Sequence, residues 1–144
     1  MTTKNRTQRF SAQEKAAMTE RAEELKAGGT GSDGEADAVA KIAEMPEADR
    51  TLATSFHELV RDVAPDLAAR TWYDMPAYAT PGKKGKVLCF FQSAAKMKTR
   101  FSTIGFSDSA ALDEESLWAT SFAVLEWNAS NEETLRALVK RAVR

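Results

Sequence analysis

Apolar residues recur three or four positions apart over residues 47–63, and this is the strongest helical pattern in the chain. Pro46 suits the first position of such a helix, and Pro65 ends it, because proline has no N–H to continue the helical hydrogen bonds. The inward side of the helix comprises Leu52, Phe56, Leu59, Val60 and Val63.

Capping boxes predict the starts of two further helices. Ser32 with Glu35 opens one that runs through Glu44, and Ser130 with Glu133 opens the last helix of the chain. The inward positions of these two helices are Ala38, Val39, Ile42, Ala43, Leu135, Leu138, Val139 and Val143.

From Thr71 onward the apolar period changes to that of β-strands. The predicted strands cover residues 72–73, 77–79, 86–92, 96–105 and 118–127. Met75-Pro76 interrupts the first two, and the third is apolar on both faces, as a central strand is. Helices, then strands, then a helix predict an α+β fold of two layers: one mainly antiparallel sheet of three to five strands with helices packed on one face.

The first 34 residues differ in composition from the rest. Ser11 and Glu14 form a capping box that predicts a helix over residues 12–27, but its apolar stripe is thin. A glycine-rich run at residues 28–34 follows, and its composition is typical of a flexible linker. We therefore expect an N-terminal helical arm with its linker at 1–34 and an α+β domain at 35–144.

The chain of 144 residues carries a net charge of −1, but the charge is unevenly spread. Residues 67–106 hold seven Lys or Arg and one acidic residue, whereas the segments 35–66 and 107–144 are acidic. The polar N-terminus lacks a signal peptide and no apolar run is long enough to span a bilayer, so we expect a cytoplasmic protein without a membrane. Its single cysteine, Cys89, lies in an apolar strand and is expected to be a buried hydrophobe.

A group of motifs, spread over about three-quarters of the chain, carries a family resemblance. These motifs are Ile42, Pro46, Trp72-Tyr73-Asp74-Met75-Pro76-Ala77-Tyr78, Val87-Leu88-Cys89-Phe90-Phe91, Thr103-Ile104-Gly105-Phe106, Trp118 and Phe122. With them the chain resembles the YdhG-like family, bacterial proteins of largely unknown function. The resemblance implies an α+β fold. Because some members are labelled frataxin-like iron chaperones, it also implies iron as a cofactor.

Acidic residues at the junction of the two middle helices are the candidates for holding iron. Glu44, Glu47 and Asp49 cluster there, and carboxylates are suitable ligands for hard cations. The other interpretation is a solvated face with favourable charge at a helix N-terminus. Zinc is disfavoured, because one cysteine and one histidine, His57, cannot supply the usual ligand set within one chain.

The basic central segment offers a different candidate site. Lys96, Lys98 and Arg100 alternate, so on a strand they would share one face that suits a phosphate, a carboxylate or an acidic protein partner. The alternative is an exposed edge whose lysines deter aggregation. The aromatic block next to them could line a ligand pocket or simply fill the core. The predicted ligand-binding residues are Tyr73, Asp74, Met75, Tyr78, Lys98 and Arg100.

These patterns favour a binding protein over an enzyme. No nucleophile-elbow or similar catalytic turn is present, and acid–base candidates are few in the aromatic segment. The leading hypothesis is a non-catalytic binding protein for a small anion or for iron. The alternative is a protein–protein interaction module, with an acidic partner or a homodimer and no small ligand. The acidic balance of the whole chain, with a pI of about 5.9, disfavours nucleic acid.

Overall fold

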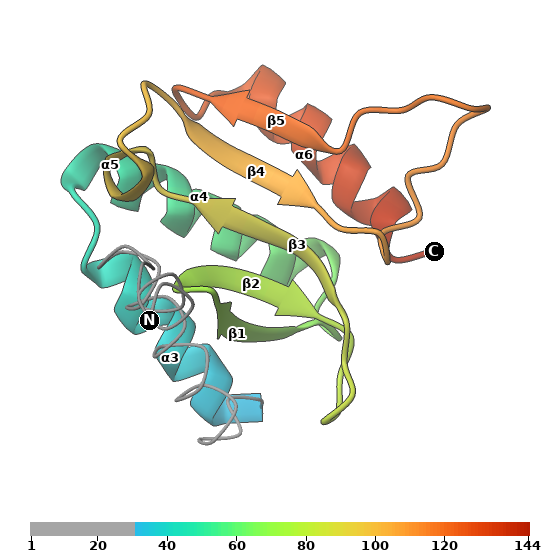
Figure 1. Cartoon of the computed structure of the whole chain (residues 1–144), viewed down its shortest axis with the longest axis horizontal. Coiled ribbons are helices and arrows are strands. Elements are labelled where there is room, and N and C mark those ends of the chain that lie inside the picture. The colour runs from blue at the N-terminus through green and yellow to red at the C-terminus, as the bar shows by residue number, and fades with distance from the viewer. Residues whose placement is uncertain (1–30) are drawn as a thin grey trace, which may run out of the picture.

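The computed structural model describes residues 31–144 (Figure 1), and the predicted helix over residues 12–27 lies outside this range. The described chain forms one five-stranded sheet in which neighbouring strands are antiparallel and follow the order of the sequence. Helices accompany the sheet, so the predicted α+β class with a single antiparallel sheet is confirmed.

Three helices of more than one turn are present in residues 31–144: α3 (Gly31–Ala43), α4 (Glu47–Val63) and α6 (Ala129–Ala142). The bounds of α4 agree with the prediction, except that Pro46 stands just before the helix, as its N-cap. The start predicted for α3 is wrong, because the helix already includes Gly31–Gly34 and Gly34 is buried. The last residues of the predicted linker are thus part of the folded unit.

The start of α6 also differs from the predicted one. Asn128 is the N-cap, and its side-chain oxygen accepts a hydrogen bond from the Asn131 N–H at 2.8 Å. Ser130 therefore lies inside the first turn. The Trp127 indole N–H donates to the Glu132 carboxylate at 2.9 Å, which fixes the chain as it enters the helix. Asparagine is as good an N-cap as serine, so the sequence contains two competing start signals.

The sheet consists of β1 (Ala68–Trp72), β2 (Met75–Ala79), β3 (Val87–Gln92), β4 (Ser102–Phe106) and β5 (Ser121–Val124). The predicted strand over residues 86–92 is confirmed as β3, and it is the central strand. The strand predicted over residues 118–127 is shorter, because only Ser121–Val124 pairs with β4.

A two-residue turn joins β1 to β2, and it does not lie at the predicted break. Tyr73 and Asp74 have φ angles of 51° and 64°, so both adopt the left-handed conformation that a type I′ hairpin turn requires. The interruption predicted at Met75-Pro76 is wrong, since both residues belong to β2. Pro76 is tolerated there because the pairing of β2 with β3 begins only at Ala77.

The predicted alternation of basic residues along one strand is wrong as well. Lys96 lies in the short helix α5 (Ala94–Met97), and Lys98 ends that helix with a φ of 57°. The Ser93 hydroxyl caps α5 by accepting from the Lys96 N–H at 3.3 Å. The chain therefore winds through residues 94–98 and becomes a strand only at Ser102.

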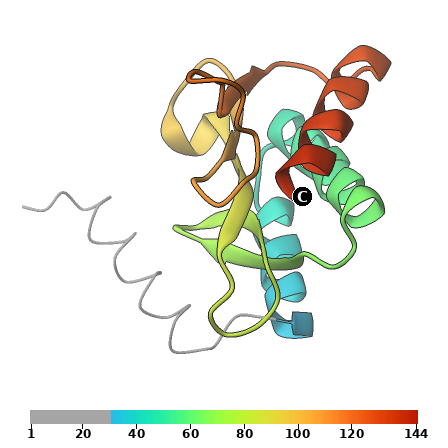
Figure 2. The same ribbon diagram turned by 90° about the vertical axis from the view of Figure 1, so that its right-hand side faces the viewer.

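Helices α4 and α6 pack together on one side of the sheet (Figure 2). The core between these layers contains five fully buried side chains: Phe56 and Val60 of α4, Val139 of α6, Phe91 of β3 and Ile104 of β4. Helix α3 lies against β1 and the neighbouring β2. It approaches closely because it buries small residues, Gly34 and Ala38.

Aromatic rings lie on the opposite side of the sheet. Trp72 and Phe90 are half-buried, and their ring centroids are 5.4 Å apart. Ala77, which pairs with Phe90, is small enough to let the two rings meet above β2. The Phe90 ring also lies over Gly105 of β4, where a Cβ atom would come within 2.3 Å of the ring.

We expect Gly105→Ala to lower the free energy of unfolding by about 1–2 kcal/mol, because the new methyl group displaces the Phe90 ring. Urea unfolding measures this change. The same substitution in a Phe90→Leu background should cost clearly less. An equal cost in both backgrounds would mean that the ring contact is not the cause.

Candidate functional site

A cavity of about 310 Å³ lies between the end of α3, the β1–β2 turn and α5. Its floor is mostly apolar and comes from Met45, Pro46, Met75, Pro76 and Phe91. Its charged lining groups are Lys41, Glu44, Asp74 and Lys96. A small concave site with an apolar floor and a few polar groups is the usual form of a ligand pocket.

Asp74 organises the charged side of this cavity. Its side chain is only 15% exposed, and each carboxylate oxygen forms an ion pair, one with Lys41 of α3 and the other with Lys96 of α5. The Lys96 ammonium group also donates to the Asp74 main-chain carbonyl at 3.3 Å. The turn that holds Asp74 therefore connects two helices that are far apart in the sequence.

Two ammonium groups and two carboxylates line the cavity, and both ammonium groups meet at one of these carboxylates, that of Asp74. Glu44 lies 3.8 Å from Lys41, but its side chain is 68% exposed, so water largely screens its charge. An ammonium group has three N–H donors, and carboxylate and phosphate oxygens are its natural acceptors. Chemically, the arrangement is suited to holding a small anion above an apolar floor.

The structure brings together only some of the predicted ligand-binding residues. Asp74 and Met75 line the cavity, and Tyr73 is the neighbouring turn residue, with its ring centroid 5.0 Å from that of Trp72. Tyr78, Lys98 and Arg100 are not among the lining residues. The sequence analysis named Lys96 as part of the basic strand face but left it out of the ligand-binding residues, and it did not name Lys41 at all. No local pattern marks Lys41, which reaches the site only because α3 packs beside β1.

The three acids proposed as iron ligands do not share a site. Asp49 is buried, and its carboxylate accepts from the Ser93 hydroxyl at 2.6 Å, the Ala95 N–H at 2.9 Å and the Ser102 hydroxyl at 3.3 Å. Glu44 and Glu47 are exposed. Within residues 31–144, no group of three or more His, Cys, Asp or Glu side chains is placed to hold a metal ion. Iron stays a prediction of the family resemblance.

We expect Asp49→Ala to lower the free energy of unfolding by about 2–4 kcal/mol, because it leaves the polar groups around α5 without their shared acceptor. Urea unfolding of this variant is best compared with Glu47→Ala, which removes an exposed acid from the same helix and should change stability by less than about 0.5 kcal/mol. Similar losses in both variants would contradict a structural role for Asp49.

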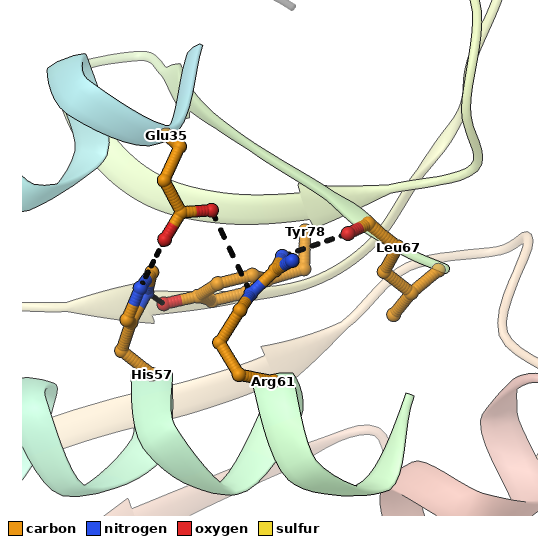
Figure 3. A network of polar contacts seen from close by, with 5 residues as sticks. All are labelled: Glu35, His57, Arg61, Leu67 and Tyr78. Atoms are coloured by element: carbon orange, nitrogen blue, oxygen red, sulfur yellow. Dashed lines mark hydrogen bonds and ion pairs between the residues drawn. The ribbon is translucent and has the colours of Figure 1, made fainter. Parts of the chain in front are cut away.

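The single histidine lies in a second polar network, between α3, α4 and β2 (Figure 3). His57 Nε2 is 2.6 Å from the Glu35 carboxylate, and Nδ1 is 2.8 Å from the Tyr78 hydroxyl. Because a carboxylate only accepts, Nε2 carries the proton, and in the neutral ring Nδ1 accepts from the Tyr78 O–H. Arg61 Nε lies 3.6 Å from the other oxygen of Glu35, and its Nη2 donates to the Leu67 carbonyl at 2.7 Å.

This network fastens α3 to the rest of the domain. The Tyr78 side chain is fully buried, and burial, followed by the nearby Cys89 thiol, raises the pKa of its hydroxyl well above the usual 10.0. The hydroxyl therefore stays protonated and remains a donor to His57. The sequence analysis considered His57 only as a zinc ligand. Its partners come from elements far away in the sequence, so no spacing rule reveals them.

Buried Cys89 and Tyr78 predict a loss of stability in alkali. Burial raises the pKa of Cys89 from 9.0 to about 12, so above pH 9 the unfolded chain releases the thiol proton while the folded chain keeps it. Stability is therefore lost as the pH rises, by up to about 1.4 kcal/mol per pH unit from this thiol alone. Cys89→Ala should reduce that slope in urea unfolding between pH 9.0 and about 10. An unchanged slope would contradict the assignment.

Comparison with known proteins identifies no relative of the chain. No family model, no curated protein and no solved structure matches the chain. Among the helices described for residues 31–144, none is long and apolar enough to cross a membrane. The functional argument therefore rests on the residues of the site.

Proposed function

We propose that this protein binds a small anionic molecule, a carboxylate or phosphate with a short apolar body, in the cavity beside Asp74. The observation that carries the proposal is the position of Lys41 and Lys96. Their ammonium groups meet at one carboxylate on the wall of a cavity of about 310 Å³ with an apolar floor. The anion would interact with both ammonium groups, and its apolar part would cover Met75 and Pro76.

The lining residues favour binding over catalysis. Ser93 is the one hydroxyl-bearing residue that lines the cavity, and it is 5% exposed. Its hydroxyl donates to Asp49 at 2.6 Å and accepts from the Lys96 N–H at 3.3 Å, so it holds the start of α5. A serine nucleophile needs an accessible oxygen and a base that removes its proton as the oxygen attacks the substrate. The Ser93 hydroxyl is buried, and its proton already binds the buried carboxylate of Asp49.

A non-catalytic, cytoplasmic binding protein of this kind is also the leading hypothesis from the sequence patterns. Iron is not part of the proposal, because only the resemblance supports it. An interaction module without a small ligand stays the alternative.

Calorimetric titration with acetate, butanoate and inorganic phosphate at low salt tests the proposal. We expect saturable binding at one site, and butanoate should gain about 0.8 kcal/mol over acetate for each buried methylene. Lys41→Gln and Lys96→Gln should each weaken binding about tenfold, which is the loss of one charge-assisted contact. Binding should also weaken as salt is added.

Lys98→Asn is the matched control. It removes a lysine two positions from Lys96 that does not line the cavity, and asparagine tolerates the left-handed backbone at this position. The control should bind like the unmodified protein. Absent binding, or an equal loss in Lys96→Gln and Lys98→Asn, would refute a defined site.

A further inference from the structure

A second and larger cavity, of about 610 Å³, lies where β4 and β5 meet the first turns of α6. Ile104 of β4 pairs with Phe122 of β5, and directly opposite residues of paired strands point to the same face of the sheet. Val124 lies two positions further along β5, so it shares that face. With Leu135 of α6, these side chains give the cavity an apolar floor.

Most of the polar groups around this cavity already have partners within the fold. The Asn128 side chain caps α6, and its amide nitrogen donates to the Glu126 carboxylate at 3.2 Å. The Asn131 amide nitrogen donates to the Glu126 main-chain carbonyl at 3.0 Å. These contacts fix the edge of the cavity. Both asparagine side chains are already hydrogen-bonded to Glu126 or to the start of α6.

Arg100 is different, because no carboxylate of residues 31–144 forms an ion pair with it. Glu126, the other charged residue lining the cavity, accepts a hydrogen bond from the Asn128 amide and forms no ion pair with Arg100. Its guanidinium carbon lies 5.3 Å from the centroid of the Phe101 ring, which keeps the group beside the apolar floor. A planar guanidinium is the side chain best suited to binding a carboxylate through two parallel hydrogen bonds.

We propose that this cavity binds an amphipathic acid, that is, a single carboxylate on a long apolar chain. The carboxylate pairs with Arg100, and the chain covers Phe122 and Leu125, whose side chain is otherwise 72% exposed. Charge complementarity with the unpaired arginine selects an acid over a neutral or cationic chain. The site is separate from the proposed small-anion site, because no residue lines both cavities.

Calorimetric titration with dodecanoate, below its micellar concentration, tests this site, and dodecanol serves as the uncharged analogue. We expect one saturable site for dodecanoate and an affinity for dodecanol that is about tenfold lower, as the loss of one charge-assisted pair predicts. Arg100→Gln should lower dodecanoate affinity to that of dodecanol. Thr134→Phe, at an exposed lining position of α6, should fill the cavity and abolish binding of both.

Two controls separate this site from general basic charge and from the small-anion site. Lys98→Asn and Lys96→Gln should bind dodecanoate like the unmodified protein, since neither residue lines this cavity. Unchanged affinity in Arg100→Gln, or uptake that never saturates, would overturn the proposal. So would a protein that forms dimers in ultracentrifugation and binds no dodecanoate.

Discussion

The ion pairs of Asp74 hold the candidate site together. A type I′ turn forces both of its central residues into the left-handed region, and aspartate is among the few residues that accept this conformation. The same geometry places the carboxylate between lysines of α3 and α5. One turn residue thus satisfies a backbone constraint and collects two positive charges at a cavity.

Helix α3 depends on such polar contacts more than α4 does. Helix α3 buries one large apolar side chain, Ile42, beside the small Gly34 and Ala38, whereas α4 buries Leu52, Phe56, Leu59 and Val60. Polar contacts hold α3 near both ends: Glu35 with His57 near its start, and Lys41 with Asp74 near its end. Since one wall of the small-anion cavity belongs to α3, the shape of that cavity depends on these contacts.

Much of the fold could be predicted from local sequence signals. The apolar period defines α4, and the apolar run defines β3, because burial on one face or on two leaves a direct pattern in the sequence. Turns and caps were harder. Tyr73-Asp74 contains no glycine, so it lacks the usual hairpin signal, and Asn128 and Ser130 are competing N-caps between which spacing alone does not decide.

The site was only partly predictable, because its residues come from segments that are far apart in the sequence. Asp74 and Met75 belong to a conspicuous aromatic block, and the structure places them at a cavity. Lys41 lies on a helix that arrives from elsewhere in the chain. Lys96 alternates with Lys98 and Arg100 as if on a strand, yet a serine cap winds this segment into a helix. Lys96, Lys98 and Arg100 therefore have different surroundings. Lys96 lines the small-anion cavity, and Arg100 lines the cavity between β4, β5 and α6.

A double-mutant cycle tests the role of Asp74 most directly. It combines Asp74→Asn, which keeps the turn, with Lys41→Gln or with Lys96→Gln, and it measures the free energy of unfolding in urea. We predict a coupling energy of about 1 kcal/mol for each pair, and a coupling near zero for the exposed pair Lys41–Glu44. Coupling near zero in both Asp74 cycles would contradict the account.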